Sequence, residues 1–180
     1  MILFDSLYQR KGESMKKVLF FLLILGTSLL QAKMFQSVPE DKATLVQSGK
    51  DARYCSMCGM DLVKFYKTSH VANVDGKPTQ FCSIHCLFDA INSGKKVTDI
   101  KVVDTKSLKL IDAKKAYYVV GSDVKGTMSH VSKYAFATMQ DAKMFAQKHG
   151  GKIMNFEEAL QEAKKDFEHP MMMHHKKHMK

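Results

Sequence analysis

The stretch Tyr54–Ala90, YCSMCGMDLVKFYKTSHVANVDGKPTQFCSIHCLFDA, contains all four cysteines of the 180-residue chain. Cys55 and Cys58 form a C-x-x-C motif, and a second pair follows at Cys82 and Cys86. Such a concentration of soft sulfur ligands indicates metal or thiol chemistry. We therefore take this stretch as the part around which the fold is organised.

Turn and periodicity signals within this stretch predict a knuckle, a hairpin and a helix. Gly59 permits the tight turn that points two sulfurs at one centre. Alternation over residues 65–74, an Asp-Gly turn and residues 77–81 predict a β-hairpin. The period then becomes helical over residues 82–93, with Ser83 as the N-cap. This spacing places the sulfurs of the second cysteine pair on one face of the helix start.

The rest of the chain predicts an α+β domain. A helix over residues 38–50 is expected to lead into the cysteine stretch. Further strands are expected at 97–103, 116–120, 134–137 and 152–154, with a short segment at 108–112, and helices are expected at 139–149 and 155–167. A strand–helix–strand order recurs in the two halves, which predicts a duplicated fold with two pseudo-equivalent β-α-β units.

The two ends of the chain do not have the pattern of a folded domain. Residues 15–32 combine a lysine pair, an apolar run shorter than the roughly 20 residues of a membrane span, and a small-residue end, which is typical of a signal peptide rather than a retained anchor. Residues 1–14 are interpreted as an overlong start, and residues 33–168 as the mature metal-binding domain. Residues 169–180, ending in MMMHHKKHMK, are expected to form a disordered tail that collects metal weakly.

Composition and charge narrow the function and the location. The net charge is +10, but the lysines are scattered without Arg-rich runs, so a nucleic-acid partner is not expected. Because no cysteine lies at the cleavage site, we expect a periplasmic protein rather than a lipoprotein. Exported proteins also form disulfides, and four cysteines allow three pairings among which the sequence does not choose.

The methionines help to decide which metal is expected. The chain has 13 of them, and thioether is a natural ligand for Cu(I) but a rare one for zinc. Met60 adjoins the first cysteine pair, and Met128 lies beside His130 as Met-x-His in the glycine-bounded loop 121–132. Core packing is an equal alternative for either methionine alone. Copper is therefore the expected metal, with zinc as the alternative.

The order C-x-x-C-G-M, a hairpin, and F-C-S-x-H-C opening a helix resembles the NosL family, accessory proteins of nitrous oxide reductase regarded as copper chaperones. Met128-Ser129-His130 and the following YAFATMQDAKMFAQKHGGKIMNFEEAL resemble the C-terminal pattern of that family, so that the resemblance covers most of residues 53–160. It implies an exported Cu(I)-binding domain with a duplicated β-β-α-β fold, similar to that of organomercury lyase. Typical members are lipoproteins, and this chain adds the Cys82, Cys86 pair and the His/Met tail.

The cysteine stretch alone also resembles YHS and TRASH-type metal-binding modules. In those modules a cysteine of the first knuckle joins the second pair around one metal, which implies a constellation of Cys58, Cys82 and Cys86.

The leading hypothesis is a protein, not an enzyme, that holds Cu(I) and delivers it to a periplasmic or membrane target. The candidate metal ligands are Cys55, Cys58, Met60, Cys82, Cys86, Met128 and His130, with Met128, His130 and cysteine sulfur as the holding site. Expected partners are a copper-accepting apo-enzyme, with nitrous oxide reductase as the family's example, or a copper transporter, with transient membrane contact. The alternatives are a thiol–disulfide oxidoreductase using Cys55 and Cys58, and an interaction domain stapled by zinc or disulfides.

Overall fold

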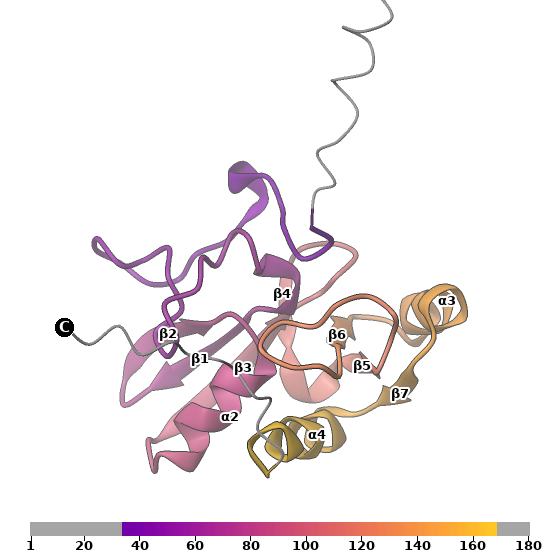
Figure 1. Cartoon of the computed structure of the whole chain (residues 1–180). Helices are drawn as coiled ribbons and strands as arrows, with labels where there is room; N and C mark the ends of the chain where they lie inside the picture. Colours follow the sequence, from indigo (N-terminus) through magenta and orange to yellow (C-terminus); the bar gives the residue numbers. More distant parts are fainter. Residues whose placement is uncertain (1–33, 169–180) are drawn as a thin grey trace, which may run out of the picture. The chain divides into compact units, whose positions relative to one another are not determined.

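The structure is a computed structural model that describes residues 34–168 (Figure 1). The predicted signal peptide, the residues before it and the His/Met tail lie outside these residues. Within the described part, no helix combines the length and the apolar character that crossing a membrane requires. The described residues form an α+β fold with two antiparallel sheets, as the sequence predicted.

The first sheet has four antiparallel strands in the order β2-β1-β3-β4. These strands are β1 (His70–Val74), β2 (Lys77–Phe81), β3 (Val97–Val103) and β4 (Leu110–Asp112), and helix α2 (Ile84–Asn92) connects β2 to β3. Asp75 and Gly76 both have positive φ, 50° and 84°, so the β1–β2 hairpin closes through the tight turn that an Asp-Gly pair favours. The hairpin and the helix behind it were both predicted.

Pro78 lies in β2, which is an edge strand of this sheet. Two residues further along, Gln80 directs its backbone away from β1, because its N–H donates to Gln47 Oε1 at 3.1 Å and its carbonyl accepts from Ser56 N–H at 3.3 Å. Pro78 shares this outward orientation, where its missing N–H removes no ladder hydrogen bond. A proline is tolerated in this strand because the strand is at the edge.

The second sheet has three antiparallel strands in the order β6-β5-β7. These strands are β5 (Tyr117–Val120), β6 (Lys133–Phe136) and β7 (Lys152–Met154); helix α3 (Met139–His149) connects β6 to β7, and α4 (Phe156–Glu168) follows. Each sheet thus contains a β-β-α-β run in which the first strand lies between the other two. The duplication expected from the sequence stays a prediction, since the first sheet has a fourth strand that the second lacks.

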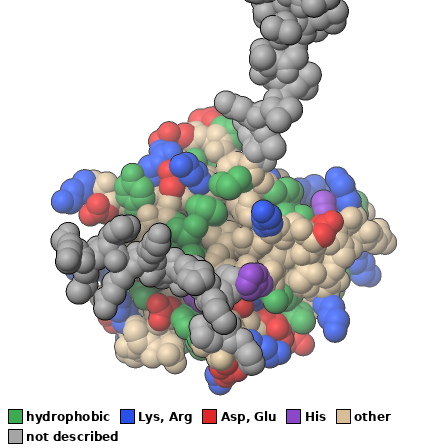
Figure 2. Space-filling model, in the orientation of Figure 1, with side chains coloured by type: hydrophobic (Ala, Val, Ile, Leu, Met, Phe, Trp, Pro, Cys, Tyr) green, Lys and Arg blue, Asp and Glu red, His purple; other side chains and the backbone are tan. Residues whose placement is uncertain are grey.

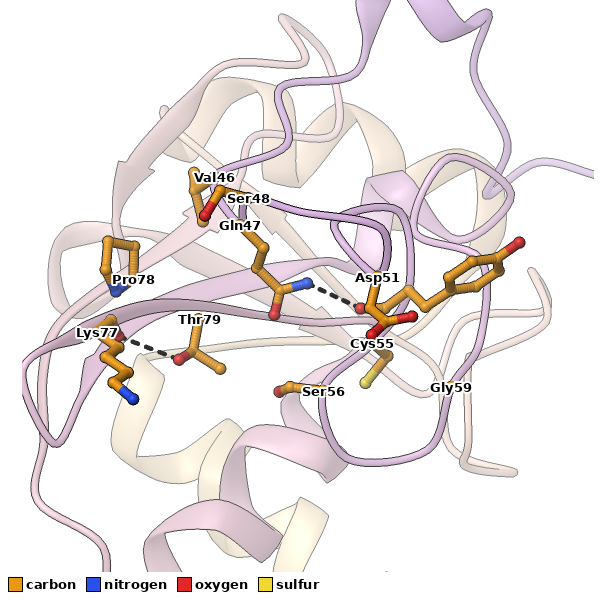
Figure 3. Close-up of a pocket in the computed structure, with 11 residues that line it drawn as sticks. Val46, Gln47, Ser48, Asp51, Cys55, Ser56, Gly59, Lys77, Pro78 and Thr79 are labelled. Atoms are coloured by element: carbon orange, nitrogen blue, oxygen red, sulfur yellow. Dashed lines mark hydrogen bonds between the residues drawn. The ribbon is translucent and has the colours of Figure 1, made fainter.

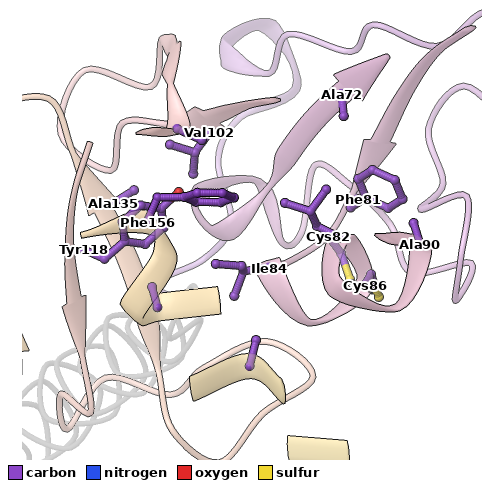
Figure 4. Packing of buried hydrophobic residues seen from close by; sticks show 14 of the residues in the cluster. Ala72, Phe81, Cys82, Ile84, Cys86, Ala90, Val102, Tyr118, Ala135 and Phe156 are labelled. Atoms are coloured by element: carbon purple, nitrogen blue, oxygen red, sulfur yellow. Dashed lines mark hydrogen bonds between the residues drawn. The ribbon is translucent and has the colours of Figure 1, made fainter. Parts of the chain in front are cut away.

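Helix α4 begins with a reciprocal cap and packs against the cysteine half of the fold. Asn155 Oδ1 accepts from Glu158 N–H at 2.9 Å, and Glu158 Oε2 accepts from Asn155 N–H at 2.8 Å. The buried face of α4 is narrow and consists mainly of alanine, so α4 lies close to α2. One core joins the two sheets through this helix, and Ala159 and Ala163 of α4 belong to it. Its other buried members include Phe81, Cys82, Ile84, Cys86, Val102, Tyr118, Ala135 and Phe156 (Figure 4).

Two local predictions were wrong. Residues 38–50 contain only a short 3-10 turn, Glu40–Lys42, instead of a helix. Their backbone amides find tertiary partners, since Thr44 N–H donates to the Tyr66 hydroxyl at 3.0 Å and Val46 N–H donates to Gln80 Oε1 at 3.1 Å. The strand expected from residue 65 begins only at His70, after a 3-10 turn over Tyr66–Thr68.

Candidate metal centre

The first cysteine pair lies in a tight knuckle. Gly59 N–H donates to the Cys55 carbonyl at 2.9 Å, and Cys55 N–H donates to the Met60 carbonyl at 2.8 Å. Gly59 has a φ of 73°, a left-handed conformation that side chains other than glycine's rarely adopt. The backbone therefore folds back on itself within one turn and directs both sulfurs to the same side, as predicted.

The base of this knuckle is fixed by Asp61. Its carboxylate accepts from Val63 N–H at 2.9 Å, from Lys64 N–H at 3.1 Å and from Arg53 Nε at 2.9 Å. Desolvation raises the pKa of Asp61, but the bond to Arg53 and the two backbone N–H groups outweigh it and hold the pKa below its usual value. Asp61 stays charged and closes the loop.

The second cysteine pair lies at the start of α2. Cys82 follows β2 directly, and Cys86 lies in the first turn of the helix. Their sulfurs are 3.7 Å apart, which confirms that the helical spacing places them on one face. Ser83 stands at the N-cap position as predicted, but its side chain makes no capping hydrogen bond.

The four cysteines converge on one point, and all are free thiols. Their Sγ atoms all lie within 4.8 Å of one another, with Cys58 and Cys82 at 3.5 Å. Metal–sulfur bonds of about 2.3 Å in a tetrahedron would separate the sulfurs by about 3.8 Å. The donor set therefore fits a single soft metal ion in its present arrangement. A fifth sulfur, Met60 Sδ, lies 3.9 Å from Cys82 Sγ.

The pKa values of the four thiols shift in opposite directions. Hydrogen bonds from Cys58, Cys82 and Cys86 lower the pKa of Cys55 far below the ordinary thiol value. The contact with Cys55 raises the pKa of Cys58, but those with Cys82 and Cys86 outweigh it, and the net shift is downward. Interactions with Cys55 and Cys58, together with burial, raise the pKa of Cys82 and of Cys86. A cation that binds all four sulfurs must displace the protons of Cys82 and Cys86.

The four thiols differ in exposure. Cys55, Cys82 and Cys86 are at most 4% exposed, whereas Cys58 is exposed. Cys58 is therefore the thiol of the cluster that is exposed to solvent.

A groove of about 790 Å³ borders the knuckle (Figure 3). Its walls are the segment before the knuckle, the knuckle itself and the start of β2, and its lining includes Gln47, Tyr54, Cys55, Gly59, Lys77 and Thr79. Gln47 donates to the Tyr54 carbonyl at 2.8 Å across this groove. On the face of the molecule in Figure 2, basic side chains are spread among acidic and apolar ones rather than gathered in one patch.

The predicted site residues fall into two groups. The four cysteines and Met60 lie together. Met128 is half-buried and packs against the core cluster that contains Cys82 and Cys86. His130 is exposed. Among the described residues, the cysteine, histidine and acidic side chains that lie close enough to share a metal ion are the four cysteines, and His130 is not part of this group. The role of Met128 and His130 as ligands stays a prediction.

Sequence reasoning missed an ion-pair network beside the loop that carries Met128 and His130. Lys133 and Asp166 are 3.1 Å apart, and the Lys133 side chain is only 2% exposed. Burial lowers the pKa of Lys133, although Asp166 opposes this shift. A lysine at the start of a strand and an aspartate near the end of a polar helix give no signal of their pairing.

The fold and the site define a small α+β domain with a cluster of free thiols suited to a soft metal ion. The model of the NosL family matches residues 46–164. Because this match spans more than half of the chain, the protein belongs to the NosL family, which confirms the resemblance noted in its sequence.

Individual relatives agree with this assignment. Over 58 residues the chain is 53% identical to the copper-binding lipoprotein NosL of Stutzerimonas stutzeri, and this alignment spans 30% of each protein. The crystal structure of the copper chaperone NosL from Shewanella denitrificans matches with a TM-score of 0.51 and 25% identity. That match covers 67% of this chain and 96% of the other.

Proposed function

We propose that this protein holds Cu(I) in its four-cysteine cluster outside the cytoplasm and passes it to a copper-accepting partner. The observation that carries this proposal is the convergence of four free thiols within 4.8 Å, with only Cys58 exposed. The relatives described as a copper-binding lipoprotein and a copper chaperone support copper as the cargo. The family suggests that the copper-accepting partner is nitrous oxide reductase, during its maturation.

The asymmetry of the cluster suits both holding and release. Three buried sulfurs retain the ion, because Cu(I) is stably coordinated by two or three soft ligands. Cys58 is the thiolate that an incoming ligand reaches first, so exchange begins there. The proposed transfer is therefore stepwise, with an incoming ligand replacing Cys58 before the buried sulfurs release the ion.

Zinc is the second candidate cargo. Sulfur separations of 3.5 Å and 3.7 Å are close to the edge of a four-thiolate zinc tetrahedron, and Met60 would then be a packing residue. Elemental analysis of protein isolated from the periplasm distinguishes the two metals. Copper in about one equivalent supports the proposal, whereas zinc alone would replace it with a structural role.

The structure also bears on the oxidoreductase alternative. The Cys55-x-x-Cys58 pair is followed by Gly59 and by an isolated bridge between Tyr54 and Asp61, and no helix starts there. A redox-active C-x-x-C usually gains its low thiol pKa from a helix N-terminus that follows. Disulfide reduction that persists in metal-free protein and is lost in Cys55→Ser would support this alternative.

The ligand assignment is tested with two exposed side chains. Cys58→Ser and His130→Ala each remove a surface donor, so neither substitution disturbs the core. Cu(I) affinity is measured by competition with a chromogenic Cu(I) chelator. Four ligands share about 10–16 kcal/mol in structural zinc sites, hence about 3 kcal/mol each. Because three sulfurs remain for Cu(I) in Cys58→Ser, this share is an upper bound, and we expect the substitution to weaken binding by about 10-fold to 100-fold.

The same titration of His130→Ala serves as the comparison. A cluster made of cysteines alone predicts an affinity within about threefold of the unmodified chain. A large loss in His130→Ala with a small one in Cys58→Ser would instead place the holding site at Met128 and His130.

A further inference from the structure

The segment Gly126–His130, which we call the Met–His loop, is anchored next to the cysteine cluster on one side. Thr127 Oγ1 lies 2.8 Å from Thr68 Oγ1, and the Thr68 hydroxyl lies 2.8 Å from the Cys82 carbonyl oxygen. Both threonines are buried. The residue before Met128 is thus joined through one hydroxyl to the backbone of a cluster cysteine.

On its other side the Met–His loop is anchored by Lys133 and Asp166. Ser129 Oγ is 2.9 Å from Asp166 Oδ1, and Lys133 Nζ donates to Ser129 Oγ at 2.8 Å and to the Val131 carbonyl at 3.0 Å. Lys133 and Asp166 are paired at 3.1 Å with 2% and 14% of their side chains exposed. The residue after Met128 is therefore held by an ion pair that is largely buried.

Met128 itself adopts a backbone conformation that needs such support. Its φ is 59°, in the left-handed region that side chains other than glycine's rarely occupy. The turn before it is tight, because a Cβ at Gly126 would lie 2.8 Å from the Ser129 carbonyl oxygen. Strained residues of this kind persist where their surroundings over-determine them, and here the surroundings are the two anchors.

Asp166 contacts the cysteine helix as well. Its Oδ2 is 3.6 Å from His85 Nδ1, and the neighbouring Phe167 ring stacks on the His85 ring with centroids 4.2 Å apart. His85 directly precedes Cys86 in α2. The last turn of α4 therefore touches both the helix that carries the second cysteine pair and the loop that carries Met128 and His130.

We propose that Asp166 and Lys133 are positioning residues for metal handover, which hold Ser129 and thereby keep Met128 and His130 beside the cysteine helix as the next ligands along the exit path. This inference rests on the proposed copper-holding function. In this proposal Lys133, Asp166 and Ser129 act in the transfer of the ion, and the cysteines hold it.

Ser129→Ala is the principal test, because it removes the hydroxyl that joins the loop to the ion pair and leaves the pair itself in place. The full exported chain is loaded with Cu(I), and two quantities are measured with bicinchoninate as the acceptor: the equilibrium affinity and the stopped-flow rate of transfer. We expect transfer to be about tenfold slower, in the range found when residues that support metal ligands are removed, with the affinity within about twofold. Ser129→Thr, which keeps the hydroxyl, should restore the rate.

A double-variant comparison separates positioning from general stability. Met128→Ala should slow transfer, and adding Ser129→Ala should slow it by less than the product of the two single losses, because part of the effect of Ser129→Ala acts through the Met128 side chain. Rate losses that multiply in the double variant would overturn the proposal, and so would an unchanged rate in Ser129→Ala.

Asp166→Asn supplies a second perturbation with a matched control on the same helix. Glu168→Gln removes the same charge from an exposed pair with Lys164, so its transfer rate should be normal. Asp166→Asn should slow transfer like Ser129→Ala, provided that its circular dichroism and unfolding midpoint show a folded domain. Equal rates in Asp166→Asn and Glu168→Gln would count against positioning. Failure of the unmodified chain to bind Cu(I) is a different result, which refutes the proposed function itself.

Discussion

His70 is expected to make the domain sensitive to mild acid. It is 1% exposed and joins the two sheets, with Nδ1 at 3.0 Å from the Thr68 carbonyl and Nε2 at 3.1 Å from the Tyr118 hydroxyl in β5. The carbonyl can only accept, so Nδ1 carries the hydrogen and Nε2 accepts from the tyrosine. The buried imidazole is neutral and fully paired.

The size of the effect follows from the pKa of His70. Burial lowers this pKa from 6.5 to about 4, although the bond to the Thr68 carbonyl opposes the shift. Between these two pH values the unfolded chain binds a proton that the folded one does not, so stability is complete above about pH 6.5 and is lost as the pH falls towards 4. A difference of about 2.5 pH units corresponds to about 3 kcal/mol.

The assay is urea unfolding of metal-free, reduced protein between pH 7.5 and 4. With an m-value of about 2 kcal/mol/M, the loss lowers the urea midpoint by about 1.5 M. Carboxylates titrate in the same range, so the quantity to compare is the difference between the unmodified chain and His70→Asn. The variant is less stable at pH 7.5, but its midpoint should fall by about 1.5 M less on acidification.

His130→Asn, which removes an exposed imidazole, is the matched control and should keep the pH dependence of the unmodified chain. An equal acid response in all three proteins would refute the argument that His70 is kept neutral by burial.

Further outcomes concern the site, the tail and the core. Because Cys82 and Cys86 hold protons that a metal must displace, the chelator-competition affinity should weaken at least about tenfold per pH unit below pH 7, and a pH-independent affinity would contradict the proton assignment. Proteolytic removal of residues 170–180 should leave the tight site intact and reduce only the number of weakly bound ions in equilibrium dialysis; loss of the tight site would show that the tail belongs to it. Gln80→Ala breaks three hydrogen bonds of a buried side chain and should lower the free energy of unfolding by about 2–3 kcal/mol, whereas Lys77→Ala at an exposed position should change it by less than about 0.5 kcal/mol in the same urea titration.

Local patterns were sufficient for most of the elements near the site. The glycine after the first cysteine pair, the Asp-Gly turn and the helical spacing of Cys82 and Cys86 each act over a few residues, and each was found where it was predicted. Where a segment obtains its hydrogen bonds from distant partners, prediction failed. Residues 38–50 form no helix, because buried side chains such as Tyr66 and Gln80 bond their backbone instead.

The sequence by itself determined that this protein has soft ligands in a knuckle and at a helix start, because covalent spacing and turn chemistry place each pair of sulfurs. Only the tertiary structure decided that the two pairs meet within 4.8 Å, that Cys58 alone is exposed, and that His130 lies outside the cluster. It also paired Lys133 with Asp166 across 33 positions. The reason is physical: burial and long-range contact depend on how α2, α4 and the two sheets pack, and no local pattern contains that information.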